Sequence, residues 1–223
     1  MTESNELSKK EIKKLINKDN PIIIEVGAYD GADSRELNKL YEHAICFCFE
    51  ADPRSQKLFI KMNSRNTLIL EKYAVGSIDG EVDFYTSDSD TRRHKHNTHS
   101  WSASSSLKKP KTHLQLFKDV QFKDCIKVNS IKLDTWYREN IVKDIVDFIW
   151  VDINGAEEDF ILGASKTLKE KTRFLYIEFS DKELYENQIT KDKMLELLPD
   201  FELLSIHNFK GNFGNLLLKN KTL

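Results

Sequence analysis

Short apolar runs alternate with amphipathic stretches along most of this chain. Apolar residues at helical spacing predict a helix over residues 6–18, and a β-branched run predicts a buried strand over residues 22–26. The two patterns recur and predict further elements: strands over 44–49, 68–70, 81–85, 147–151 and 174–179, helices over 33–41, from 53, over 157–168 and over 191–198, and paired strands over 202–207 and 215–218. This alternation predicts an α/β fold with a single doubly wound, mostly parallel, seven-stranded sheet, a C-terminal antiparallel hairpin and an N-terminal helix.

The length of the chain and one polar segment bear on its domain organisation. The 223 residues are enough to bury one core without disulfides or metals. We expect residues 1–20 to form a helical extension and residues 21–223 to form a single domain. Residues 87–111 carry almost no apolar periodicity, so they are predicted to be a polar loop that acts as a lid.

Charge and cysteine use narrow the classes of partner. The formal net charge is −2 with 31% charged residues, and no excess of positive charge favours nucleic acid. No apolar run approaches the roughly 20 residues that span a bilayer. Cys46 and Cys48 alternate in a predicted strand and are expected to pack in the core, which is typical of a reducing compartment. We therefore expect a cytoplasmic protein without a membrane span, and the sequence leaves its oligomeric state open.

Glycine and acidic residues mark a ligand site at the ends of the first two predicted strands. Gly27 allows a sharp turn close to a ligand, and at Gly31, which opens the next helix, a side chain would collide with the cofactor. Glu50 ends the second strand, where a carboxylate can accept hydrogen bonds from both hydroxyls of a ribose. Since ligands of doubly wound sheets bind at the carboxyl ends of the strands, the pattern predicts a nucleoside cofactor here.

Two cofactors share this general arrangement, and the residues of the turn distinguish them. The G-x-G-x-x-G fingerprint of dinucleotide dehydrogenases is absent, because Ala28, Tyr29 and Asp30 separate Gly27 from Gly31. A carboxylate at Asp30 would repel a pyrophosphate, but it can accept a hydrogen bond from the ammonium group of S-adenosylmethionine. The turn therefore favours S-adenosylmethionine over NAD.

Several short segments form an ordered set of motifs over roughly residues 22–218. They are EVGAYDG at 25–31, CFEADP at 48–53, AVG at 74–76 with DGEV at 79–82, SSSL at 104–107, IKLDTW at 131–136 and DFIWVDINGAE at 147–157. The set resembles the FkbM-type family of S-adenosylmethionine-dependent O-methyltransferases. The resemblance implies a class I methyltransferase fold of Rossmann-like type and methyl transfer to a hydroxyl, often on a saccharide or natural product.

The resemblance and the strand-end positions together give a set of expected cofactor contacts. These residues are Glu25, Gly27, Tyr29, Asp30, Gly31, Glu50, Ala51, Ala74 and Asp152. Two positions depart from the family pattern, which usually has asparagine at Tyr29 and glutamate at Asn154. The first departure would change how the methionine end of the donor is held. The second removes the carboxylate on which a catalytic role at Asn154 would depend.

Acidic residues at the ends of the fourth and fifth sheet strands are the candidates for catalysis. A sugar hydroxyl is a poor nucleophile, and Asp152 or Glu178 can take its proton as the new bond forms. His207 is an alternative base because the pKa of histidine lies near neutrality. Asp152 and Glu178 can instead hold magnesium or manganese, with Asn154 as a third oxygen ligand, although nothing in the sequence requires a metal. The competing structural interpretations are a helix cap at Asp152 and surface packing at His207.

The predicted lid supplies candidate contacts to the acceptor. Arg92 and Arg93 can bind phosphate or carboxylate groups, and the indole of Trp101 can stack on a sugar ring. Ser105 and Asn154 complete the expected substrate set. A group of histidines in and near this run suggests zinc, but it lacks cysteine and regular ligand spacing: His94, His96, His99 and His113. A lid without direct contacts to the acceptor remains the alternative.

The favoured interpretation is an O-methyltransferase that acts on a sugar, a glycan or another small hydroxylated acceptor. Methylation of nitrogen is disfavoured because residues 152–155 read DING rather than the Asn/Asp-Pro-Pro-aromatic tetrapeptide of amino-group methyltransferases. A non-sugar small molecule and a binding module that keeps the fold without turnover both remain open. The sequence does not identify the acceptor or the hydroxyl that is methylated.

Overall fold

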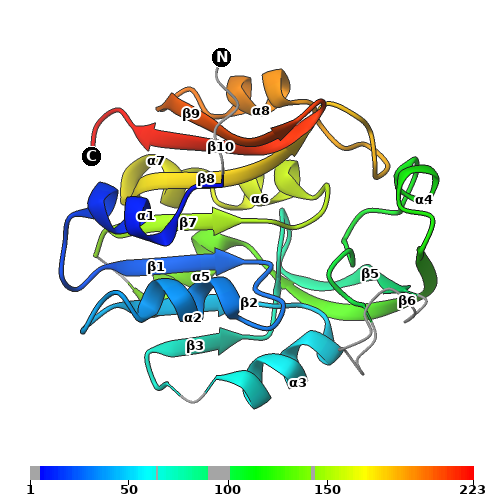
Figure 1. Cartoon of the computed structure of the whole chain (residues 1–223), viewed down its shortest axis with the longest axis horizontal. Coiled ribbons are helices and arrows are strands. Elements are labelled where there is room, and N and C mark those ends of the chain that lie inside the picture. The colour runs from blue at the N-terminus through cyan, green and yellow to red at the C-terminus, as the bar shows by residue number, and fades with distance from the viewer. Residues whose placement is uncertain (1–5, 64, 90–100, 142–143) are drawn as a thin grey trace.

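The computed structural model describes residues 6–63, 65–89, 101–141 and 144–223. Its centre is a seven-stranded sheet in the order β3-β2-β1-β7-β8-β10-β9 (Figure 1). The strands of this sheet are β1 (Ile22–Val26), β2 (Ile45–Phe49), β3 (Leu68–Glu71), β7 (Val146–Val151), β8 (Thr172–Ser180), β9 (Phe201–Lys210) and β10 (Phe213–Asn220). The predicted α/β fold with a mostly parallel seven-stranded sheet and a C-terminal antiparallel hairpin is confirmed.

The order of the strands reverses beside β1. From β1 the chain adds β2 and β3 on one side, and it later adds β7 and β8 on the other side, all in parallel. β10 then pairs antiparallel with β8, and β9 pairs antiparallel with β10. The carboxyl ends of β1 and β7 therefore lie side by side at the switch point, where doubly wound sheets bind ligands.

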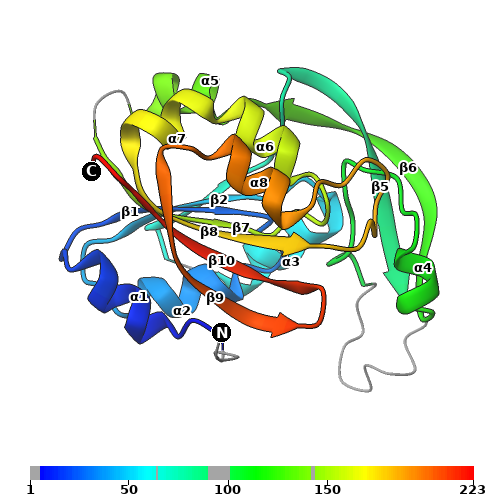
Figure 2. The ribbon, with the colours of Figure 1, turned by 90° about the horizontal axis from the view of Figure 1, so that it is seen from above.

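Helices cover both faces of the sheet, and each face has its own core (Figure 2). One face carries α1 (Lys9–Ile16), α2 (Ala32–Asn38) and α3 (Pro53–Met62); the other carries α5 (Leu133–Asn140), α6 (Glu157–Gly163), α7 (Ser165–Lys171) and α8 (Lys191–Leu197). The predicted N-terminal helix is confirmed and begins with a capping box between Ser8 and Glu11. Ile12 and Ile16 bury its apolar side in the same core as Cys46 and Cys48, which are free thiols.

A second sheet was not predicted. It has three strands in the order β4-β6-β5, formed by β4 (Ala74–Val75), β5 (Gly80–Ser89) and β6 (Val120–Ile131). β6 escaped prediction because much of it is solvated and carries charged residues, so its hydrophobic signal is weak. β5 and β6 extend beyond the carboxyl ends of β1 and β7, and α4 (His113–Leu116) lies at their far end (Figure 1).

Two further sequence-based boundaries differ from the structure. The single helix expected over 157–168 is two helices, α6 and α7, which meet at Ala164. The region expected to be a lid over 87–111 includes the end of β5, and Ser106 forms a bridge with Tyr85 of that strand. Among the described residues, no helix has the length and apolar character needed to cross a membrane.

Candidate active site

The turn after β1 brings the backbones of β1 and β7 very close together. Gly27 has φ +90°, and a Cβ atom there would lie 1.9 Å from the carbonyl oxygen of Asp152. The amides of Gly27 and Ala28 both donate to the carbonyl of Phe49, at 3.0 and 2.9 Å. Only glycine fits this position, because any side chain would meet the neighbouring backbone in a conformation that L-residues rarely adopt.

The side chain of Glu50, directly after β2, connects the turn after β1 with the turn after β2. Its Oε2 accepts a hydrogen bond from the Tyr29 amide and its Oε1 accepts one from the Asp52 amide, each at 2.7 Å. Burial raises the pKa of Glu50 to about 8, against the lowering effect of these bonds. A carboxylate has about four acceptor positions, so Glu50 keeps acceptor capacity for a ligand beside these bonds.

A cavity of about 260 Å³ opens at the two turns, and we call it the turn cavity. It is lined by most residues expected to contact a cofactor and two expected to contact substrate: Glu25, Gly27, Tyr29, Asp30, Glu50, Ala51, Ala74, Asp152, Ser105 and Asn154. Gly31 is not among the lining residues. Gly31 precedes α2 with a φ of +73°, and a Cβ there would lie 2.5 Å from the Phe59 ring, so packing against α3 by itself requires glycine at this position.

Two acids of the turn cavity differ in their environment. Asp30 accepts a hydrogen bond from the Ala32 amide at 2.9 Å, which fixes its carboxylate at the start of α2. Glu25 is 5% exposed, and its Oε2 has no hydrogen-bond partner among the described residues. Burial raises the pKa of Glu25 to about 8, although a hydrogen bond from Ser34 opposes the shift.

Asp152 and Glu178 meet at the ends of β7 and β8 and share a hydrogen bond. The pKa of Glu178 is raised well above its usual range, first by burial and then by the negative charge of Asp152. The side chain of Asp152 is open to the turn cavity, yet the cavity walls limit its hydration and raise its pKa as well. The pair therefore retains one shared proton more readily than two isolated carboxyl groups would.

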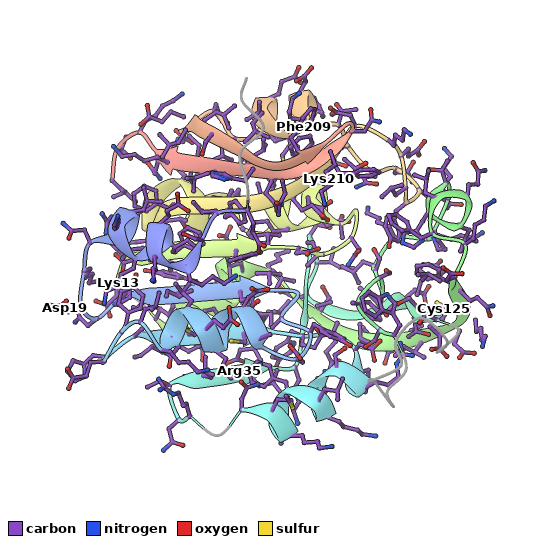
Figure 3. The ribbon with its side chains drawn as sticks, viewed as in Figure 1. Lys13, Asp19, Arg35, Cys125, Phe209 and Lys210 are labelled. Atoms are coloured by element: carbon purple, nitrogen blue, oxygen red, sulfur yellow. The ribbon has the colours of Figure 1, made fainter. Side chains whose placement is uncertain are left out.

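A second cavity, of about 520 Å³, lies against the C-terminal hairpin, and we call it the hairpin cavity. Glu178 lines it, as do Trp101 and Asn154 from the expected substrate set. Lys210 also lines it from the end of β9 (Figure 3). Asn154 belongs to both cavities, so the two spaces adjoin beside the Asp152–Glu178 pair.

Residues 101–107 form the partition between the two cavities. Ser102, Ala103, Ser105 and Leu107 line the turn cavity, whereas Trp101 and Ser104 line the hairpin cavity. Hydrogen bonds from three parts of the chain hold this segment: Ser105 to Asp52 at 3.0 Å, Asn154 Nδ2 to the Ala103 carbonyl at 3.1 Å, and Tyr185 Oη to the Ser104 carbonyl at 2.8 Å. Residues 101–107 of the predicted lid thus form a wall held by hydrogen bonds.

Asn154 has a structural role that the sequence did not reveal. Its φ of +56° is a left-handed conformation that asparagine tolerates better than most residues. Its side-chain amide donates to Ala103, which a glutamate carboxylate cannot do, and its own carbonyl accepts from Ser106 Oγ at 2.7 Å. The asparagine that stands in place of the family's glutamate therefore helps to hold the partition in position.

The remaining candidates lie elsewhere. His207 is not among the residues that line either cavity; its Nε2 hydrogen bonds with Ser205 at 2.7 Å, and its ring lies 5.9 Å from that of Tyr176. His113 is buried among Phe117, Phe122 and Tyr185, and burial lowers its pKa to about 4. The other expected residues of the loop lie outside the described residues: Arg92, Arg93, His94, His96 and His99. Within the described ranges, no three His, Cys, Asp or Glu side chains group as metal ligands.

Several lining residues were not predicted. Tyr73, Phe84 and Leu107 give the turn cavity its apolar walls, and they come from loops and from the second sheet. Asp52 supports the partition and caps α3 by accepting from the Arg54 amide at 2.9 Å. Its position before Pro53 was a readable helix-start signal. Asn215 stands out only as a polar residue before the apolar run of β10.

The strand order, the glycine turn and the acid after β2 together define a class I methyltransferase. A family model described as "Methyltransferase FkbM domain" matches residues 25–209. The chain therefore belongs to the FkbM methyltransferase family, as the sequence motifs had indicated.

Relatives support this assignment. The chain is 38% identical over 215 residues to 2-O-methyltransferase NoeI of Sinorhizobium fredii, which covers 96% of this chain and 85% of the relative. The chain is an O-methyltransferase. The FkbM methyltransferase structure from Methylobacillus flagellatus has a TM-score of 0.53 at 14% identity, covering 90% of this chain but only 44% of that one.

Other solved structures share the fold at low identity. A putative rRNA-methylase from Clostridium thermocellum has a TM-score of 0.54 at 12% identity. The match covers 99% of this chain and 98% of that chain. Fibrillarin from Aeropyrum pernix, which holds S-adenosyl-L-methionine, has a TM-score of 0.51 at 10% identity and covers 92% of this chain and 68% of that chain. These likenesses show that the chain shares the methyltransferase fold.

Proposed function

We propose that S-adenosylmethionine binds in the turn cavity and that its methyl group passes to a sugar hydroxyl presented from the hairpin cavity. The observation that carries this proposal is the position of the Asp152–Glu178 pair: Asp152 lines the first cavity and Glu178 the second. The name of the 38% identical relative, a 2-O-methyltransferase, favours the 2-hydroxyl of the sugar. The buried free thiols Cys46 and Cys48 accord with a cytoplasmic site for this reaction.

The donor is held by groups that match its parts. Glu50 accepts hydrogen bonds from the ribose hydroxyls with the lone pairs that Tyr29 and Asp52 leave unused. Asp30 in the first turn attracts the ammonium group of the methionine end, and Glu25 at the end of β1 accepts a hydrogen bond from it. Tyr73 and Phe84 provide apolar surface for the adenine ring.

The reaction is an in-line displacement. The acceptor oxygen forms a bond to the methyl carbon while the carbon–sulfur bond breaks, and sulfur keeps the electron pair to give S-adenosylhomocysteine. The proton of the hydroxyl goes to the carboxyl pair, which begins the step with one negative charge. Asp152 is the general base in this proposal, and the proton on Glu178 keeps it oriented through their shared hydrogen bond.

A metal-assisted version uses the same residues. Magnesium or manganese bound by Asp152 and Glu178 would lower the pKa of the hydroxyl. One contact favours the metal-free version: the two carboxyl groups already share a hydrogen bond with each other. Activity retained after dialysis against EDTA supports the metal-free version, and activity restored only by added metal contradicts it.

Calorimetric titration with S-adenosylhomocysteine, with NAD as a control, tests the donor site. Micromolar binding of S-adenosylhomocysteine and none of NAD is the expected result. Transfer of labelled methyl from S-adenosylmethionine to simple glycosides then tests the acceptor class, and mapping the product by NMR locates the methylated oxygen. Donor binding with transfer only to non-carbohydrate hydroxyls would overturn the sugar assignment and leave the donor site intact.

A further inference from the structure

Asn215 of β10 lies directly opposite Glu178 of β8 in the antiparallel register. Residues paired in this way point to the same face of the sheet, with Cβ atoms about 4.5 to 5.5 Å apart. Both side chains line the hairpin cavity. Asp152, Glu178 and Asn215 therefore form a row from the switch point of the sheet into this cavity.

The polar capacity of this row is largely unused. Among the described residues, the side chain of Asn215 makes no hydrogen bond, and Glu178 bonds only to Asp152. Asn215 is half-buried, on a strand whose next residues, Leu216, Leu217 and Leu218, are all buried. A primary amide with two donors and an acceptor, held at the wall of a cavity beside a catalytic carboxylate, is suited to bind a ligand hydroxyl.

We propose that Asn215 binds the hydroxyl adjacent to the one that is methylated, so that the enzyme prefers a vicinal diol. This inference rests on the proposed function, because it takes the Asp152–Glu178 pair as the place where the reacting hydroxyl lies. Two vicinal oxygens lie roughly one hydrogen-bond length apart, which matches one oxygen on the carboxyl pair and the next on the amide across the strand. Asn215 is thus a specificity residue of the acceptor site.

The test compares acceptors that possess or lack the neighbouring hydroxyl. The probes are methyl β-D-glucopyranoside, methyl β-D-galactopyranoside and methyl α-D-mannopyranoside, each with its analogue deoxygenated next to the methylated carbon. Wild type is expected to prefer the diol by about tenfold in kcat/KM, the size of one neutral hydrogen bond. Asn215→Ala is expected to lose about that factor on the diol and to treat diol and deoxy analogue alike. Calorimetry should show its affinity for S-adenosylhomocysteine unchanged.

Lys219→Ala is the matched control, since Lys219 lies on the same strand and is not among the residues that line either cavity. It should keep the full preference for the diol, and thermal unfolding should show that Asn215→Ala is folded. An Asn215→Ala enzyme that still distinguishes diol from deoxy analogue overturns the inference. So does a wild-type enzyme that methylates the diols and their deoxy analogues equally well, an outcome that leaves the proposed function intact. Failure to bind S-adenosylhomocysteine would instead count against the proposed function.

Discussion

The backbone amide of Tyr29 donates to Glu50 Oε2 at 2.7 Å and so joins the turn after β1 to the end of β2. Replacing Glu50 removes this link together with the proposed ribose contacts. We expect Glu50→Ala to weaken binding of S-adenosylhomocysteine by about 1 to 3 kcal/mol, measured by calorimetry. Glu36→Gln, on the exposed side of α2, is the control and should bind like wild type. Unchanged affinity in Glu50→Ala would remove the ribose role.

Asp152 is expected to affect turnover far more than donor binding. Asp152→Asn keeps the shape of the side chain and removes the base, so kcat should fall by about 100-fold or more while donor affinity changes little. Because the pKa of Asp152 is raised, wild-type activity should rise with pH through a value above the ordinary aspartate pKa of about 3.9. Rate measurements from pH 5 to 9 give the fall in kcat and the pH dependence, and calorimetry with S-adenosylhomocysteine gives the donor affinity. Equal loss of donor affinity and of kcat in Asp152→Asn would contradict this division of roles.

Asn154 combines a left-handed backbone with an anchoring amide, and two substitutions separate these contributions. Asn154→Gly keeps the conformation accessible and loses the bond to Ala103, at a cost of about 1 kcal/mol. Asn154→Ala loses the bond and also strains the backbone, so it should cost about 1 to 2 kcal/mol more. Urea denaturation measures the difference. An alanine variant as stable as the glycine variant would show that the backbone conformation contributes nothing.

Glu25 makes stability depend on pH. Its pKa in the folded state is about 8, well above the value near 4.3 of an unfolded chain. Its contribution to stability is therefore complete below about pH 4.3, declines as the pH rises and is lost above about pH 8. Glu25→Gln lacks this decline and should exceed wild type in stability at pH 8 by about 1 to 3 kcal/mol, with little gain at pH 4. Thermal unfolding across this pH range tests the trend, with Glu81→Gln, at an exposed position of β5, as the control. A constant difference between Glu25→Gln and wild type at all pH values would contradict it.

The elements of the main sheet and the donor site were readable because local sequence determines them. Buried parallel strands such as β1 and β7 are short apolar runs, and the residues that follow them lie at the edge where ligands bind. Gly27, Glu50 and Asp152 were thus found from their positions directly after such runs. β6 was missed because a largely solvated strand that also carries charged residues shows little of that signal.

By itself, the sequence determined the α/β order of elements, the donor turn and the family, since each of these depends on residues that are near one another along the chain or form ordered motifs. The sequence also placed Asp152 and Glu178 at neighbouring strand ends. Only the tertiary structure showed that they share a hydrogen bond, placed Asn215 opposite Glu178, and left His207 outside the residues that line either cavity. It also showed that Gly31 makes room for Phe59 and that Asn154 anchors the partition. These relationships depend on strand register and on contacts between distant segments, and no local pattern of hydrophobicity or charge specifies them.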